Sequence, residues 1–256
     1  MNLVKEYINS NDNFGIICHK HPDGDTLGSG FAMYYGLLSL GKNCQIYCVD
    51  KPDKVFDILD GIGNIKPLSE LKEKKLIFCD CSDELRADFE RNIKEYNVLN
   101  IDHHISNTNF GNVNFVVDTA CATCQVMYYV LKEIGVQLNS VIAKCLYVGI
   151  CTDTNNFTNS NVNSDTFYVM SEIAKFDFGI SNIVKTIFRN KSYAKTKAIA
   201  LFIERIKIFF NDRFCVSYLT LDDIDRLKLD NTEGLVDIGV DIEGISVVAF
   251  LKEIEE

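Results

Sequence analysis

The chain has 256 residues, of which 47% are hydrophobic and 24% are charged, so it is long enough to form one or two domains with a large core. Its formal net charge of −10 argues against binding to long duplex nucleic acid, which requires many lysine and arginine contacts to phosphates. Its apolar stretches are shorter than the ~20 residues of a membrane span, and its N-terminus has no signal-peptide pattern. These features predict a soluble cytoplasmic protein that does not bind membranes.

The first three quarters of the chain alternate between short apolar runs and helical patterns. The pattern predicts an α/β fold with a doubly wound, mainly parallel sheet, because strands that alternate with helices pair in parallel. Ser140 and Asn163 are the expected N-caps of two of the helices. The predicted strands are 14–18, 45–49, 76–79, 98–101 and 115–117, and the predicted helices are 26–40, 122–134, 140–152 and 163–176.

A change of pattern near residue 188 predicts a second, smaller α+β domain. The boundary separates a domain of residues 1–188 from a domain of residues 189–256. The second domain ends directly after a strand, so we expect it to be truncated. Its predicted elements are helices at 192–206 and 221–227 and strands at 214–220 and 245–251.

All four histidines of the chain lie in two short clusters that also contain aspartate. Imidazole and carboxylate groups together form a mixed nitrogen and oxygen ligand set, which suits divalent metals of the Mn, Fe, Co and Zn kind. The clusters therefore predict a metal site, in which His21 is the least certain histidine. They read His19-Lys20-His21-Pro22-Asp23-Gly24-Asp25 and Asp102-His103-His104.

Three predicted strands end in these acidic and imidazole side chains. The first cluster follows strand 14–18, Asp80 follows strand 76–79, and the second cluster follows strand 98–101. Ligands bind beyond the carboxyl ends of the strands of a parallel sheet, so we expect these residues to meet at one edge. Asp153 ends a predicted helix and reaches the same edge if that helix packs on the sheet.

Several carboxylates in one place repel each other unless cations neutralise them. The ligands are too many for one tetrahedral ion, so two metal ions that share a carboxylate fit better. Such a pair suits in-line displacement at phosphorus. We expect Gly24, Gly28 and Gly30 to let the backbone approach a ligand, and the helix that starts near Thr26 to offer N–H groups to a phosphate.

Two other features have competing interpretations. The pairs Cys79/Cys81 and Cys121/Cys124 could bind structural zinc, but we expect most of the ten cysteines to be small buried residues. The basic stretch of residues 178–203 either positions a phosphorylated substrate or is a solvated helix face. It contains Lys185, Arg189, Lys191, Lys195 and Lys197 and no acidic residue.

Four motifs carry a family resemblance: His19-x-x-Pro22-Asp23-x-Asp25-x-x-Gly28-Ser29, Asp80, Asp102-His103-His104 and Gly149-Ile150-x-Thr152-Asp153-Thr154. In order and spacing they resemble the motifs of the DHH phosphoesterases over roughly the first 190 residues. Residues 102–107 and 121–125 are similar to the bacterial nanoRNase/pAp phosphatase branch (bifunctional oligoribonucleases).

The resemblance implies a centre with two divalent ions, of which Mn²⁺ is the expected metal. It implies that His104 faces the scissile phosphate as a general acid or phosphate ligand and that Asp102 orients the histidine pair. Ser29 and Asn107 match motif positions that we assign to substrate binding. By motif position, one ion takes His19, Asp23 and Asp80, and the other takes Asp25, Asp80, His103 and Asp153, with Asp80 as the bridge.

The chain also departs from the pattern of this branch. Residues 155–158 lack an arginine that the branch usually carries after the fourth motif, and the expected Arg-Ser and Gly-Gly-Gly-His segments are absent. Either the chain is a fragment or a shortened gene product, or it recognises its substrate differently.

The leading hypothesis is a metal-dependent phosphoesterase that hydrolyses short oligonucleotides or 3′,5′-bisphosphonucleotides such as pAp. The expected partner is accordingly a short oligonucleotide or a phosphorylated nucleotide, and the sequence leaves a homodimer open. The alternatives are a cyclic or linear dinucleotide phosphodiesterase and a truncated, non-catalytic metal-binding module.

Overall fold

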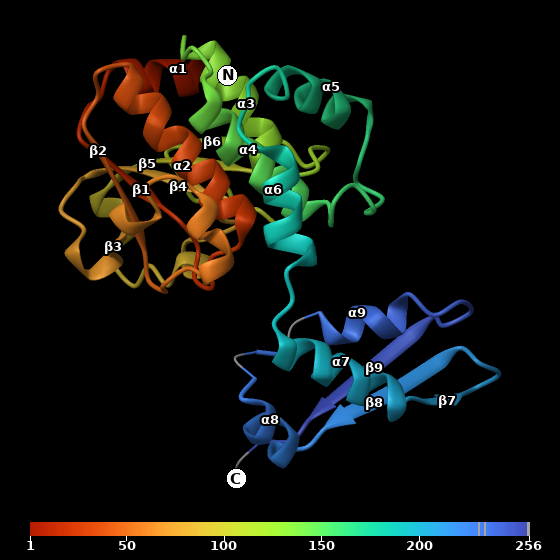
Figure 1. Ribbon diagram of the computed structural model, residues 1–256. Helices are drawn as coiled ribbons and strands as arrows, with labels where there is room; N and C mark the ends of the chain where they lie inside the picture. Colours follow the sequence, from red (N-terminus) through yellow and green to blue (C-terminus); the bar gives the residue numbers. More distant parts are fainter. Residues whose placement is uncertain (230, 233, 255–256) are drawn as a thin grey trace. The chain divides into compact units, whose positions relative to one another are not determined.

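The computed structural model describes residues 1–229, 231–232 and 234–254, and these form two compact units that divide between Phe188 and Arg189 (Figure 1). The roles predicted for the two domains remain predictions. Within the described residues, no helix is both long enough and apolar enough to cross a membrane. The first unit contains α1 (Asn2–Asn9), β1 (Phe14–Ile17), α2 (Gly24–Ser39), β2 (Cys44–Cys48), β3 (Lys66–Pro67), β4 (Lys75–Cys79), β5 (Asn97–Asp102), β6 (Val113–Val116), α3 (Thr123–Glu133), α4 (Ser140–Asp153), α5 (Ser164–Ile173) and α6 (Ile180–Val184).

The first unit is built on a six-stranded parallel sheet in the order β3-β2-β1-β4-β5-β6. This observation confirms the predicted α/β class with a parallel sheet. The strand order reverses direction between β1 and β4, and this switch point is where parallel α/β sheets bind ligands. His19 follows β1 and Asp80 follows β4, so both residues lie at the switch point.

Side chains of the strands alternate between two apolar layers. Ile16, Ile77 and Leu99 belong to the larger core, which the α-helices cover. Ile17 and Phe78 belong to a smaller core on the opposite face, which is closed by short 3₁₀ turns rather than by α-helices. The period of two residues along a strand explains this division. The sheet is therefore buried on both faces, as the continuous apolar runs predict.

The five predicted strands and the predicted helices of this unit are present, with ends that differ by a few residues. Asn163 caps α5 as predicted, in a capping box with Thr166. Ser140 does not cap α4, because Asn139 takes that position and its side chain accepts from the N–H of Ile142. The sequence did not reveal α1, β3 or α6, of which β3 has two residues and α6 has five.

The second unit is a three-stranded sheet with helices, which agrees with the predicted small α+β fold. Strand β8 pairs antiparallel with β7 and parallel with β9. Its core contains Ala198, Phe202, Leu219 and Leu235. Its elements are α7 (Tyr193–Glu204), β7 (Lys207–Phe209), β8 (Phe214–Leu219), α8 (Leu221–Leu227), α9 (Leu235–Val240) and β9 (Val247–Lys252), after a π-helical turn at Lys185–Arg189.

Candidate metal centre

The first group of candidate ligands joins β1, the start of α2 and the end of β4. The His19 Nε2 atom lies 3.4 Å from Asp23 Oδ1 and 3.4 Å from Asp80 Oδ2. His19 and Asp80 are buried, whereas the side chain of Asp23 is half exposed. Donor atoms that share one ion at about 2.1 Å each are about 3–4 Å apart, so this spacing fits a common ion.

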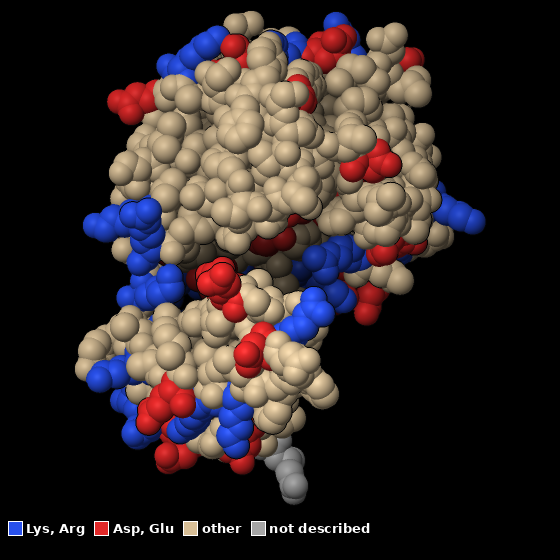
Figure 2. Space-filling model, turned by 90° about the vertical axis from the view of Figure 1, so that its right-hand side faces the viewer, with Lys and Arg blue, Asp and Glu red and all other residues tan. Residues whose placement is uncertain are grey.

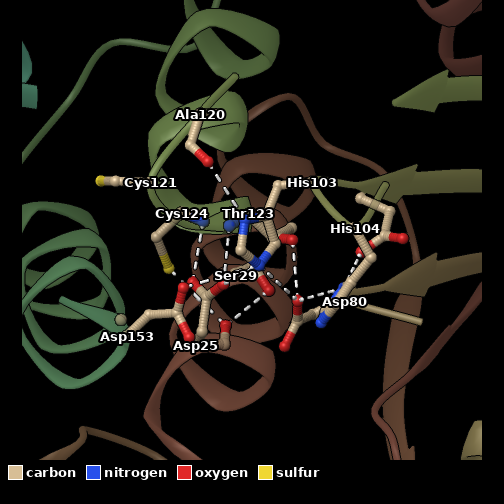
Figure 3. Close-up of polar contacts among 12 residues, drawn as sticks. Asp25, Ser29, Asp80, His103, His104, Ala120, Cys121, Thr123, Cys124 and Asp153 are labelled. Atoms are coloured by element: carbon tan, nitrogen blue, oxygen red, sulfur yellow. Dashed lines mark hydrogen bonds and ion pairs between the residues drawn. The ribbon is translucent and has the colours of Figure 1, made fainter. Parts of the chain in front are cut away.

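The second group joins α2, the loop after β5 and the C-terminal end of α4. The His103 Nε2 atom lies 3.5 Å from Asp153 Oδ2 and 4.0 Å from Asp25 Oδ2 (Figure 3). Helix α4 packs against α2, and this packing brings Asp153 to the sheet edge. The same spacing argument applies, so these three residues can hold a second ion.

Asp80 lies between the two groups. Its Oδ2 atom faces His19, and its Oδ1 atom is 3.7 Å from His103 Nε2 and 3.6 Å from His104 Nδ1. A carboxylate with one oxygen toward each group has the geometry that a bridging ligand needs. The backbone of Asp80 has a φ of +62°, which is sparsely populated for a residue other than glycine and is typical of functional sites.

Backbone carbonyl groups orient the two imidazoles of the proposed ligand sets. His19 Nδ1 lies 2.7 Å from the carbonyl oxygen of Lys20, and His103 Nδ1 lies 3.2 Å from that of Ala120. A nitrogen that faces a carbonyl oxygen carries the hydrogen, so in both rings Nε2 is the nitrogen that can bind a metal.

The acids and imidazoles of the centre influence one another's protonation. Burial raises the pKa of Asp25 well above its ordinary value, and the charges of Asp80 and Asp153 add to this effect. Burial also raises the pKa of Asp153, to about 6. Burial alone would lower the pKa of His19, but its contacts with Asp23 and Asp80 outweigh burial and raise the pKa to about 10. Without metal, the centre therefore retains protons near neutral pH that a bound cation would displace.

His104 and Asp102 form a hydrogen-bonded pair beside these two groups, and His104 also belongs to a third set of possible ligands, with Asp80 and His103. Asp102 is fully buried, and its Oδ1 atom lies 2.8 Å from His104 Nδ1. This hydrogen bond raises the pKa of His104 and leaves Nε2 free on a side chain that is 39% exposed. Asn107 donates to Asp102 Oδ2 at 2.6 Å, so the structure places Asn107 behind Asp102. That position supports orientation of Asp102 and not the substrate contact assigned to Asn107 from the motif.

Ser29 does not have the position that the motif comparison suggested. It is fully buried, and its hydroxyl donates to the carbonyl oxygens of Asp25 and Thr26 inside α2. A side chain without exposed surface cannot contact a substrate, so the structure does not support its assignment to substrate binding.

The glycines and the first turn of α2 also differ from expectation. A Cβ atom on Gly24 would lie 2.3 Å from Thr152 Oγ1, and one on Gly28 would lie 2.5 Å from the Cys145 carbonyl oxygen. These glycines therefore permit close packing of α2 on α4 rather than access to a ligand. The Asp23 side chain accepts from the N–H groups of Asp25 and Thr26, so these groups are not free for a phosphate.

The remaining histidine and the cysteines lie outside the ligand groups of the described residues. The His21 side chain is 85% exposed and pairs with Asp50 at 3.1 Å. All ten cysteines are free thiols and nine are buried, which confirms the prediction for most of them. Burial raises the pKa of the Cys79, Cys81, Cys121 and Cys124 thiols, and none belongs to a described group that could hold a metal.

The start of α3 also takes part in this centre, which the sequence did not reveal. The N–H groups of Thr123 and Cys124 donate to the two oxygens of Asp25 at 2.6 and 2.9 Å. The Thr123 hydroxyl donates to Asp80 Oδ1 at 2.9 Å (Figure 3). Thr123 thus contacts one carboxylate from each ligand group. Its place in the first turn of the predicted helix 122–134 was the available signal, because free N–H groups there attract anions.

Replacing Thr123 by valine should lower metal affinity about 10- to 100-fold, because it removes the hydroxyl that orients Asp80 and keeps the shape of the side chain. Titration calorimetry with Mn²⁺ measures the affinity. Thr123→Ser keeps the hydroxyl and should bind metal nearly as the parent does. Equal affinity for the valine and serine variants would contradict this role.

The chain is similar in sequence to a known family and to several named proteins. Residues 13–150, more than half of the chain, match the profile described as DHH family, N-terminal domain. The chain is 27% identical to the bifunctional oligoribonuclease and PAP phosphatase NrnA of Thermus thermophilus, over 100% of this chain and 78% of that protein. It is 28% identical to the protein of that name from Bacillus subtilis, over 74% of this chain and 66% of that protein.

A solved structure supports the fold. The exopolyphosphatase-related protein from Bacteroides fragilis superposes with a TM-score of 0.91 at 19% identity, over 98% of this chain and 78% of that protein. At this identity the likeness concerns the fold alone. The match to the family profile, together with the Asp-His-His triplet at the centre, shows that the chain belongs to the DHH family.

Proposed function

We propose that the chain is a metal-dependent phosphoesterase that hydrolyses short oligonucleotides, 3′,5′-bisphosphonucleotides such as pAp, or both, with two divalent ions that we take to be Mn²⁺. The observation that carries the proposal is the position of Asp80, whose two oxygens face two separate groups of ligands. The names of the Thermus and Bacillus relatives support the substrate class. The homodimer and the cytoplasmic location remain predictions from the sequence.

The ligand groups can hold the metal ions at the switch point of the sheet. His19, Asp23 and Asp80 would hold one ion, and Asp25, His103 and Asp153 would hold the other together with Asp80. When bound, two such ions supply Lewis-acid stabilisation of the charge that develops in a displacement at phosphorus. The side chains provide the fixed arrangement of donors, because helix α3 and the backbone carbonyls hold Asp25, His19 and His103 in place.

His104 is the candidate general acid. Asp102 accepts a hydrogen bond from Nδ1, and the raised pKa of His104 favours the protonated ring. Its Nε2–H can then give a proton to the leaving oxygen or donate a hydrogen bond to a phosphate oxygen. Asp102 acts through His104, since its carboxylate is fully buried and hydrogen-bonded on both oxygens.

The test is a Mn²⁺-supplemented assay on a 5′-phosphorylated dinucleotide, pAp, a cyclic dinucleotide and pyrophosphate. We expect mononucleotide from the dinucleotide, or inorganic phosphate from pAp. His104→Gln should lower kcat about 10²- to 10⁴-fold, the usual contribution of a general acid. His21→Gln is the matched control, because this exposed histidine is outside the ligand groups and its loss should leave kcat unchanged. A chain that binds Mn²⁺ and hydrolyses none of the four substrates would overturn the proposal.

A further inference from the structure

The loop that follows Asp153 has an unusual backbone. Asn155, Asn156 and Phe157 have φ angles of +45°, +55° and +68°, so three successive residues other than glycine are left-handed. Asparagine tolerates this conformation, but a bulky residue such as phenylalanine is an outlier there. A residue in such a conformation is strained and persists only where the surrounding structure holds it.

Hydrogen bonds hold this loop beside the second ligand group. The Asn159 side chain donates to the carbonyl oxygen of Asp153 at 3.0 Å, and the Phe157 N–H donates to Thr154 Oγ1 at 3.1 Å. Farther along, the Asn161 side chain donates to the carbonyl oxygen of Cys121 at 3.0 Å. Cys121 follows the residue whose carbonyl orients His103. Both ends of the loop are therefore attached to the segments that carry the second group.

The strained backbone presents an aromatic ring to a second, exposed ring. The rings of Phe157 and Phe167 are stacked, with centroids 5.7 Å apart and an interplanar angle of 28°. Phe167 is on α5 and remains 56% exposed. The side of the first unit that carries α5 in Figure 1 faces the viewer in Figure 2, where most of its surface is uncharged. A stacked pair whose second ring is exposed can accept a further flat, apolar ring.

We propose that Phe157 and Phe167 form a stacking platform for the nucleobase of the substrate. This inference rests on the proposed function. Phe157 is four residues from Asp153, so its Cα lies within about 14 Å of the Cα of that residue, and the hydrogen bonds fold the loop more tightly. Phe157 is thus near enough to lie beside the base of a nucleotide whose phosphate is at the metal centre. Every base has an aromatic face, so such a platform accepts short nucleotides without strict sequence preference.

The test compares substrates with and without a base in the Mn²⁺-loaded enzyme. Phe167→Ala should raise KM for pAp about tenfold, as expected for the loss of one base–aromatic stack, and leave KM for ribose 3,5-bisphosphate unchanged. Phe167→Tyr keeps an aromatic ring and should restore the parent KM for pAp. The dissociation constant of AMP, measured by calorimetry, should rise by a similar factor in the alanine variant.

Tyr168→Ala is the matched control. Tyr168 is the next residue of the same helix, is 48% exposed and lies outside the stacked pair, so its loss should leave KM for pAp and AMP binding unchanged. An unchanged KM for pAp in Phe167→Ala, or an equal rise in KM for the base-free substrate, would overturn the platform alone. Failure of the parent enzyme to hydrolyse any of these substrates would instead overturn the proposed function and the platform with it.

Discussion

Asp80→Asn is expected to abolish phosphoesterase activity and to disrupt both ligand groups at once. Asp80 is the residue whose oxygens face His19 on one side and His103 on the other. An amide cannot bridge two cations as a carboxylate does, so the variant loses several kcal/mol of charge stabilisation, which corresponds to at least about 10³-fold in rate. Turnover of pAp with Mn²⁺ measures the rate, and elemental analysis after dialysis measures the bound metal.

Asp88→Asn is the matched control, because it removes a carboxylate charge at another residue with a positive φ. Asp88 also has a positive φ, of +52°, and its exposed carboxylate pairs with Lys20 at 3.1 Å on the surface. The two substitutions make the same chemical change at similar backbone conformations, but only Asp80 is in the ligand groups. Asp88→Asn should keep the parent rate and metal content. Retention of two ions and full activity in Asp80→Asn would refute the shared-carboxylate arrangement.

Removal of metal should reverse the way in which stability depends on pH. In the metal-free protein the pKa of Asp153 is raised from 3.8 to about 6, so between these pH values the folded state binds more protons than the unfolded state. The protonated Asp153 carboxyl stabilises the fold below about pH 4. This contribution to the free energy of unfolding, about 3 kcal/mol, is lost as pH rises through 6. The raised pKa of Asp25 acts in the same direction.

Metal binding requires the deprotonated ligands, so with Mn²⁺ present stability should rise over the same interval. The measurement is the free energy of unfolding by urea at pH 4.5 and pH 6.5, with excess EDTA or excess Mn²⁺. Asp23 and Asp102 have pKa values below the ordinary 3.8, so their titration lies under this window and does not obscure the result. Equal pH dependence in EDTA and in Mn²⁺ would show that these carboxylates do not bind the metal.

The sequence was sufficient to predict the parallel sheet and the edge at which the candidate ligands meet. Short, mainly apolar runs such as residues 76–79 and 98–101 indicate buried strands, and each is followed at once by Asp80 or by the Asp-His-His triplet. The carboxyl ends of parallel strands share one edge of the sheet. Residues that directly follow such strands in the sequence are therefore expected to lie close together. Strand β3 and helix α6 were missed because two and five residues give no reliable periodicity.

The tertiary structure decided which ligand groups share Asp80 and which backbone and side-chain groups hold the ligands in place. The bonds from Thr123 and Cys124 to Asp25 join residues 98 and 99 positions apart, and the Ser29 hydroxyl turned out to be buried and bonded inside α2. No local pattern encodes such contacts, since they depend on the packing of α2, α3 and α4 on one face of the sheet. The sequence by itself determined which residues reach the edge of the sheet. The division of Asp80 between two groups depends on distances of a few ångströms between separate elements, and only the packed fold sets those distances.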